Sequence, residues 1–129
     1  SPGVKERRDC SCSIYDCDGM MTAQAEHVPL HLGVMPQAVK EILKLFPSSE
    51  MNSGDAYMIN DPYRGGNHLP DIIMVTPVFY QGKLFAYVGN MAHHSDVGGM
   101  RPRSMAGDAT EIFQEGIRLP GLKLAEWPF

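Results

Sequence analysis

The residues best suited to chemistry gather at the two ends of one stretch of the chain. His68 and Asp71 stand three positions apart at its start, and His93, His94 and Asp96 stand close together at its end. Two imidazoles and one carboxylate are a common protein contribution to a catalytic divalent metal site, which keeps positions open for water or substrate. The same spacing also fits hydrogen-bonded loop histidines, so a metal site requires that the two ends meet in the fold.

Two apolar runs, Ile72–Phe79 and Leu84–Met91, separate the two ends. Such near-continuous apolar runs are typical of strands that are covered on both faces. The short connection between them contains Gly82 and suits an antiparallel hairpin. We therefore expect the two runs to pair with each other.

The register of this hairpin decides which polar residues meet. The numbers of facing residues sum to about 162, which places Asp71 near Met91 and Leu69 near His93, to within one or two residues. Strict alternation would point His68 to the opposite face unless the chain turns at Pro70, and proline cannot continue a strand ladder. The hairpin thus predicts that His68, Asp71 and His93 share one end. The predicted outer neighbours of this cluster are His94 and Asp96.

The elements that must position these ends form a mainly antiparallel sheet with one helix. Asp9–Tyr15 and Met20–Ala25 flank a turn sequence, and another short strand is expected at Ala56–Ile59. Apolar residues recur at three-and-four spacing over Pro36–Phe46, with a proline in the first turn and Pro47 just past the end. This pattern predicts a helix, and the fold class is α+β.

Length and composition narrow the class of protein. The 129 residues suffice for one domain with a hydrophobic core. Apolar residues make up 43% and charged residues 20%, and no apolar run approaches the roughly 18 residues of a membrane span. The net charge is -4 and the 11 basic residues are scattered, so we expect neither a nucleic acid nor a membrane as partner. The chain begins Ser-Pro-Gly without Met, which indicates a processed end or a fragment.

The cysteines and the remaining histidines are weaker candidates. Cys10, Cys12 and Cys17 form an odd set in one short segment, which suits neither a disulfide framework nor a closed zinc site. We expect three free thiols in a reducing, cytoplasmic setting. His27 and His31 have helical spacing, but a proline lies between them, so both are interpreted as loop or strand histidines.

Five segments of the chain form a recognisable series: "KERRDCSCSIYDCDG", "AQAEHVPLHLGVMPQAV", "GDAYMINDPYRGGNHLPDI", "AHHSDVGG" and "GDATEIFQEG". In this order they resemble the N-terminal part of the hydantoinase B/oxoprolinase family, and they span nearly the whole chain. Members of that family run to several hundred residues. The resemblance therefore implies that residues 1–129 are a single domain, the leading portion of a larger protein.

The resemblance implies a cytoplasmic, ATP-coupled system. A partner subunit or domain of the hydantoinase A type, with an actin-like ATPase fold, would phosphorylate the substrate, and the complete B chain would act on the activated species. In the related large subunit of acetone carboxylase, a His-x-x-Asp pair and a later His hold manganese, and the matching positions here are His68, Asp71 and His93. The implied cofactors are one divalent metal ion (Mn, Zn or Fe) and ATP on the partner.

One loop departs from the family pattern. Where the family usually reads Thr-Pro-Gly-Ser-Met-Pro-Pro, this chain reads RPRSMAG from Arg101 to Gly107. Arg103 replaces a glycine, which removes a flexible backbone position and adds charge beside the predicted site. The departure bears on the loop geometry and on the substrate preference.

The leading hypothesis is the metal-bearing part of an ATP-dependent cyclic amide hydrolase that opens a hydantoin or 5-oxoproline ring. The metal would lower the pKa of a water molecule that attacks the carbonyl carbon, and would stabilise the developing oxyanion. Asp96 or Asp61 would take the proton, and spacing does not choose between them. The alternatives are a subunit of the acetone or acetophenone carboxylase type, which bicarbonate dependence would reveal, and a noncatalytic module that docks the ATPase partner.

Overall fold

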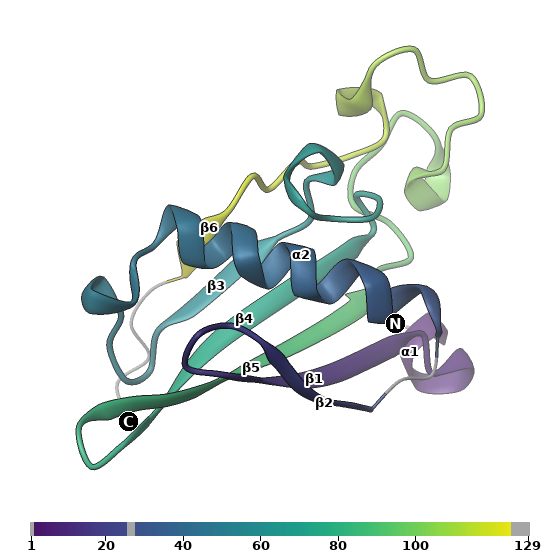
Figure 1. Cartoon of the computed structure of the whole chain (residues 1–129). Helices are drawn as coiled ribbons and strands as arrows, with labels where there is room; N and C mark the ends of the chain where they lie inside the picture. Colours follow the sequence, from purple (N-terminus) through teal and green to yellow (C-terminus); the bar gives the residue numbers. More distant parts are fainter. Residues whose placement is uncertain (1, 26–27, 125–129) are drawn as a thin grey trace.

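The computed structural model of the chain describes residues 2–25 and 28–124, and its main feature is one six-stranded sheet (Figure 1). The strands are β1 (Cys10–Asp16), β2 (Met21–Ala25), β3 (Ala56–Ile59), β4 (Asp71–Tyr80), β5 (Lys83–His93) and β6 (Leu122–Leu124). Their order across the sheet is β2-β1-β5-β4-β3-β6, and every neighbouring pair is antiparallel. The α+β prediction, a mainly antiparallel sheet with one long helix, is confirmed.

The predicted β4–β5 hairpin is confirmed, with a register two residues from the expected one. Tyr80 pairs with Lys83, so the turn consists of Gln81 and Gly82 only. Both turn residues have positive φ values, 49° and 75°, which match the twist of a tight hairpin. A register shift after Val78 adds one further position. As a result, the strand residue opposite Asp71 is His93 itself.

Helix α2 (Leu30–Leu45) begins six residues before the predicted start and ends one residue before Phe46. The prediction placed Pro36 at the first turn because proline is favoured there, but Pro36 lies inside the helix. The buried side chains of α2 continue the apolar face back to the first turn: His31, Met35, Ala38, Val39 and Ile42. The free energy gained by packing that face outweighs the loss of the one helical hydrogen bond that Pro36 cannot donate.

Other short elements complete the chain. The predicted β1–β2 hairpin and the β3 strand are confirmed, and the Asp16 carboxylate accepts hydrogen bonds from the backbone N–H groups of Asp18 and Met20 in the first turn. The remaining helices are short: α1 (Pro2–Arg7), η1 (Ser48–Glu50), η2 (Pro62–Arg64), η3 (Pro102–Ser104) and η4 (Ile112–Gln114). No helix in the described ranges is long and apolar enough to span a membrane.

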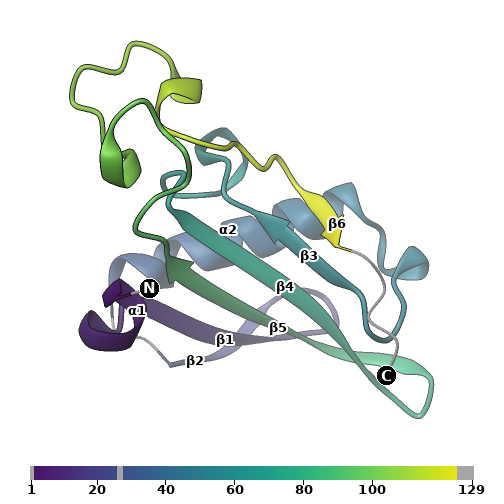
Figure 2. The ribbon, with the colours of Figure 1, turned by 180° about the vertical axis from the view of Figure 1, so that it is seen from behind.

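The core lies between α2 and one face of the sheet. Three buried tyrosines, Tyr15, Tyr57 and Tyr87, pack there with apolar side chains from α2, β4 and β5. Seen from behind, the strands lie in front and α2 lies beyond them, so α2 covers one face of the sheet only (Figure 2). The polar ends of β4 and β5 point to the α2 side, because Asp71 and His93 are in phase with the core residues of their strands.

The structure also places the weaker candidates from the sequence, a histidine and three cysteines. His31 was interpreted as a loop or strand residue, which is wrong: it is a buried residue of α2, and its Nδ1 atom lies 2.9 Å from the hydroxyl oxygen of Ser11. Its partner in the sequence pattern, His27, lies outside the described residues. Cys10, Cys12 and Cys17 are free cysteines, and the two strand cysteines lie on the sheet face opposite α2.

An ion pair between the buried Asp55 and the partly exposed Lys123 fixes β6 to the rest of the sheet and gives a first prediction. Asp55 is fully buried, and its Oδ2 atom lies 2.9 Å from Nζ of Lys123 and accepts a hydrogen bond from the Tyr57 hydroxyl. Burial alone would raise the pKa of Asp55, but these contacts and the Asn52 N–H outweigh burial and lower it. The carboxylate therefore stabilises the fold above the unfolded pKa of about 3.9, and this stabilisation is lost as the pH falls through the lower folded pKa.

We expect Asp55→Asn to lower the free energy of unfolding by about 2 kcal/mol at neutral pH, because it leaves the Tyr57 hydroxyl and the Lys123 ammonium without their anion. The gap between wild type and variant should shrink below about pH 3.9. Urea denaturation at a series of pH values measures both effects. If the difference in unfolding free energy between wild type and variant stayed constant down to acid pH, the ionised Asp55 carboxylate would not be its cause.

Candidate metal site

A tight turn brings His68 to the end of the β4–β5 hairpin. The backbone N–H of Asp71 donates to the carbonyl oxygen of His68 at 2.9 Å, so the chain turns at Leu69 and Pro70, as predicted. The buried Asn60 side chain holds this turn, because its amide donates to the carbonyl oxygen of Leu69 at 2.8 Å. The turn removes His68 from the alternation of the strand and leaves it on the same side as Asp71.

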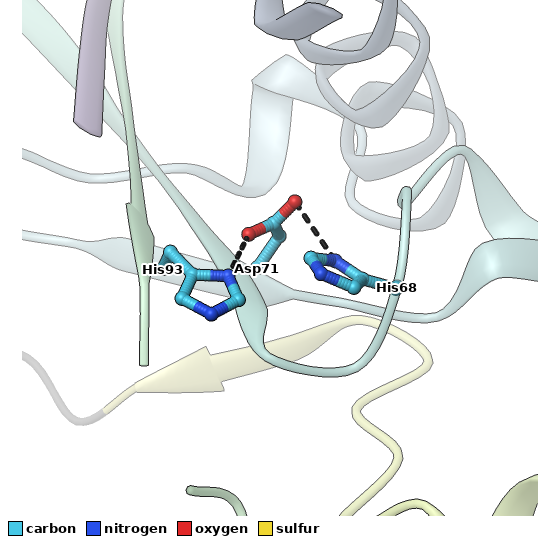
Figure 3. Close-up of side chains that lie close together, drawn as sticks. All are labelled: His68, Asp71 and His93. Carbon is cyan, nitrogen blue, oxygen red and sulfur yellow. Dashed lines mark hydrogen bonds and ion pairs between the residues drawn. The ribbon is translucent and has the colours of Figure 1, made fainter. Parts of the chain in front are cut away.

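The structure brings together the three residues predicted as ligands. The Asp71 carboxylate lies between the two imidazole rings (Figure 3). Its Oδ2 atom is 2.9 Å from Nδ1 of His68, and its Oδ1 atom is 3.0 Å from Nδ1 of His93. The ring centroids are 5.2 Å apart. The Asp71 side chain is almost fully buried, whereas those of His68 and His93 are 33% and 22% exposed, so the cluster opens to solvent through its histidines.

The contact between His68 and Asp71 is short but poorly directed. Nδ1 of His68 is a buried atom with no hydrogen-bond partner of acceptable geometry among the described residues, although Oδ2 of Asp71 is 2.9 Å away. A buried nitrogen that lacks a directed partner carries a free-energy cost. An ion bound between the imidazole and the carboxylate would remove that cost.

The charges of the cluster favour an ionised carboxylate. Burial raises the pKa of Asp71, but the contacts with His68, Asn67 and His93 together outweigh burial, so the pKa lies below its ordinary value. The contact with Asp71 in turn raises the pKa of His68, against the effect of burial. An ionised carboxylate beside two imidazoles is a donor set that divalent transition metals accept.

The geometry of the cluster fits one divalent ion. Each of His68, Asp71 and His93 offers one ligand atom, and these atoms all lie within 4.8 Å of one another. Two ligand atoms that are each 2.0 to 2.3 Å from an ion are at most about 4.6 Å apart. Closure around an ion therefore requires only small side-chain movements.

Asn67 is a member of this cluster that the sequence analysis missed. Its side-chain amide donates to Oδ2 of Asp71 at 2.8 Å. An asparagine in a Gly-rich loop carries no spacing signal of its own, although its place directly before His68 could have drawn notice. The hydrogen bond fixes the orientation of the carboxylate.

We expect Asn67→Ala to weaken binding of a divalent ion by about 10-fold, the lower end of the range for partners that orient a ligand. The reason is that the Asp71 carboxylate loses the donor that holds its orientation. Isothermal titration with Mn²⁺ or Zn²⁺ measures the change. Unchanged affinity would mean that Asn67 does not orient Asp71 in the bound state.

His94 and Asp96 follow β5 directly but do not contact the three clustered residues in any described interaction. The His94 side chain is exposed, and its backbone N–H donates to the carbonyl oxygen of Pro70 at 2.8 Å. The Asp96 carboxylate accepts hydrogen bonds from the backbone N–H groups of Gly98 and Arg103 and from the Ser104 hydroxyl. These hydrogen bonds lower the pKa of Asp96, which makes it a weaker base and an organiser of the loop.

Asp61 is buried and paired with an arginine, whereas a general base must be able to reach the proton that it accepts. Its side chain is fully buried, and its Oδ2 atom is 2.8 Å from both Nε and Nη2 of Arg118. Its Oδ1 atom accepts the backbone N–H of Tyr63. The proton-acceptor role of Asp61 or Asp96 stays a prediction, and both carboxylates already have partners that such a role would disturb.

The loop that departs from the family pattern keeps a glycine-like backbone. Arg103 has φ 72° and Ser104 has φ 52°, both in the left-handed region that glycine enters most easily. The buried Ser104 hydroxyl accepts the backbone N–H groups of Val97 and Gly99, which helps to hold this conformation. Arg101 pairs with Asp108 at 2.7 Å. Arg101 and Arg103 thus change the surface charge of the loop, while its backbone conformation stays one that glycine favours.

A cavity of about 240 Å³ adjoins the cluster. It is lined by His68, the loop residues 104–107 and Glu115. The Glu115 side chain is only partly exposed. The cavity gives a small molecule a place beside the candidate metal ligands.

Comparison with known proteins identifies the family. The hydantoinase B/oxoprolinase family model matches residues 1–127. The chain is 43% identical over 126 residues to 5-oxoprolinase 1 of Arabidopsis thaliana, and the match covers 98% of this chain and 10% of that protein. It is 37% identical to the caprolactamase subunit beta of Pseudomonas jessenii, over 90% of this chain and 20% of that protein.

Two solved structures share the fold. The nucleotide-free structure of acetone carboxylase matches 97% of this chain and 17% of its own, with TM-score 0.85 and 26% identity. The ATP-dependent caprolactamase of Pseudomonas jessenii matches 90% of this chain and 20% of its own, with TM-score 0.81 and 36% identity. The chain thus spans a fifth or less of the length of these proteins. By its sequence and its fold, the chain belongs to the hydantoinase B/oxoprolinase family.

Proposed function

We propose that this chain is the metal-bearing part of an ATP-dependent cyclic amide hydrolase that opens a hydantoin or 5-oxoproline ring. The observation that carries the proposal is the convergence of His68, Asp71 and His93 at the end of the β4–β5 hairpin. Relatives named 5-oxoprolinase and caprolactamase support the cyclic amide as the substrate class. The partner in this proposal is a hydantoinase A type ATPase subunit or domain that activates the substrate.

Each of the described residues has its own role in the proposed site. His68, Asp71 and His93 would hold one divalent ion, Mn, Zn or Fe, which when bound activates water and polarises a carbonyl group. Asn67 keeps the Asp71 carboxylate in place. The open depression of about 240 Å³ beside His68 has room for a five-membered ring. Asp96 or Asp61 remains the proposed proton acceptor.

The same proposal concerns the place of the chain in the whole protein. We take residues 1–129 as a single domain, the N-terminal portion of a longer B-type chain. Its relatives support this, because the matched region is a small share of each of them. A cytoplasmic location fits the three free cysteines.

A second candidate is a carboxylase subunit of the acetone or acetophenone type. The observation in its favour is the TM-score of 0.85 with acetone carboxylase, over 97% of this chain. The lower identity of that match, 26% against 43% for the plant 5-oxoprolinase, favours the hydrolase. If the full-length protein catalyses neither ring opening nor carboxylation, the noncatalytic assembly module is the remaining candidate.

The test is an assay of the full-length protein with its ATPase partner. We expect ring opening of 5-oxoproline or a hydantoin that requires ATP and does not require bicarbonate. His93→Ala should abolish the reaction, while His94→Ala, which alters an exposed neighbour, should keep most of it. A strict requirement for bicarbonate would favour the carboxylase, and full activity of the His93→Ala protein would exclude the proposed site.

A further inference from the structure

The sheet face opposite α2 carries mostly apolar side chains in its central rows. One row of facing residues crosses all six strands: Ala25, Cys12, Asn90, Met74, Met58 and Leu122. A parallel row, one pair further along, contains Ala23, Ile14, Val88 and Thr76. Neither row contains a charged residue. We call these two rows the outer face.

The outer face is accessible in this part of the protein. Ile14 is 48% exposed, Val88 37% and Leu122 44%. An apolar groove of about 390 Å³ runs along β1 and β2, with Cys12, Ile14 and Val88 in its lining. Figure 2 shows this side, with α2 behind the strands. Among the described residues, no helix comparable to α2 packs on it.

A face of this size requires a layer of structure to cover it. Six strands about 4.8 Å apart span roughly 24 Å from the first to the last. A single helix about 10 Å wide covers less than half of that width. Large exposed apolar patches are uncommon on free proteins, and a charge-free patch is typical of permanent interfaces, because transient ones are about as polar as the rest of the surface.

We propose that the outer face is the inner surface of a second layer, and that this layer is built by the remainder of the same polypeptide. The length of the relatives favours this occupant, because this chain covers only 10% of the plant 5-oxoprolinase and 20% of the caprolactamase subunit. In both solved structures, too, the matched region belongs to a chain at least five times as long. The lack of charge on the outer face favours a permanent contact within one polypeptide over a transient contact with a separate partner.

The candidate metal site is consistent with this arrangement but independent of it. Asp71 and His93 point to the α2 side of the sheet, so a layer on the outer face leaves the cluster and its cavity open. The second layer therefore does not depend on the metal site or its chemistry, but it rests on the proposed place of this chain in a longer polypeptide. Its test needs no activity measurement.

The test uses Cys12, which lies on β1, the second strand of the outer face, and is exposed in the described chain. The full-length gene product is purified without its ATPase partner, confirmed as a monomer, and labelled with a maleimide. Labelling of Cys12 is followed by peptide mass spectrometry. We expect Cys12 to react at least about 100-fold more slowly than in the same protein unfolded in urea, since only local opening would expose it.

Every other outcome overturns the proposal. Fast labelling of Cys12 in the monomer would mean that the outer face is free. Protection that arises only when the ATPase subunit is added would assign the face to that partner. Protection that arises only at concentrations where the protein dimerises would assign it to a second copy. A natural gene product that ends at Phe129 would leave no remainder to form the layer.

A pair of variants tests the same face by perturbation. Val88→Lys places a charge in the central rows, whereas Met20→Lys places one in the exposed β1–β2 turn. We expect Val88→Lys to bring the labelling rate of Cys12 close to that of the unfolded protein, because a buried unpaired ammonium opens the interface. Met20→Lys should leave the rate unchanged. Equal rates in both variants would overturn the proposal, and if Val88→Lys fails to fold, the labelling of the wild type decides.

Discussion

The full-length protein with His93→Ala is expected to bind one divalent ion at least about 100-fold more weakly than the wild type. Loss of a residue that merely orients a ligand costs 10- to 100-fold in affinity, so loss of one of three ligands should cost more. His93 faces Asp71 across the hairpin, and no other described histidine joins the cluster with His68 and Asp71. The ion would keep only two protein ligands, which do not hold a transition metal tightly.

Metal content after dialysis and titration with Mn²⁺, Zn²⁺ and Co²⁺ measure this effect. His94→Ala is the matched control, because it removes an imidazole one residue away that is exposed and outside the cluster. We expect its affinity to fall by no more than about 10-fold, as for an outer-sphere neighbour. Far-UV circular dichroism and a thermal melt without metal show whether both variants fold alike.

Two results would contradict the metal assignment. One is a wild-type protein that is folded and complete but binds no divalent ion above background. The other is a His93→Ala protein that binds as tightly as the His94→Ala protein, which would place the ion elsewhere. The absorption spectrum of a Co²⁺ complex adds a second readout, because its intensity and position depend on the coordination number and donor set.

The hairpin that carries the site could be predicted from the sequence, because local signals determine it. Two apolar runs and a short connection with Gly82 fix both the pairing and the approximate register. The register was two residues off, since the length of the turn and the shift after Val78 depend on backbone geometry that composition does not reveal. Pro70 gave the turn that brings His68 to Asp71, and this feature could also be predicted from the residue type.

Partners that are distant in the sequence could not be predicted in the same way. Asp61 is one of two candidate bases between which spacing does not choose, and its partner, Arg118, is 57 residues further along the chain. The hydrogen bonds of Asp96 to the backbone depend on the left-handed conformation of Arg103, which a non-glycine residue rarely adopts. The early start of α2 was hidden by Pro36, since its local preference was outweighed by tertiary packing of the helix.

Gly66→Ala is expected to destabilise the protein by about 3 kcal/mol and to displace His68. A Cβ atom at this position would lie 2.5 Å from the carbonyl oxygen of Asn60 and 2.8 Å from that of Asp61. Both obstacles are backbone atoms, so no side chain can rotate away. The loop is also closed by a hydrogen bond of 2.9 Å from the Gly66 N–H to the Asp61 carbonyl oxygen, which limits its adjustment.

A backbone displacement at Gly66 should also move the His68 imidazole, because Gly66 stands two residues before His68 in the loop that leads into β4. We therefore expect Gly66→Ala to weaken divalent-ion binding together with stability. Gly33→Ala is the matched control: Gly33 is an exposed residue of α2, and a Cβ atom there meets nothing within 4 Å. This change should stabilise the protein by about 0.5 to 1 kcal/mol, since alanine is the better helix former.

Urea denaturation and metal titration of both glycine variants separate the two effects. Opposite signs of the stability change, with loss of metal affinity only in Gly66→Ala, are the expected pattern. If Gly66→Ala were as stable as the wild type, the loop could not be packed against Asn60 and Asp61 as described. If it were destabilised but bound the ion with full affinity, the position of His68 would not depend on this loop, and another element would have to hold the imidazole beside Asp71.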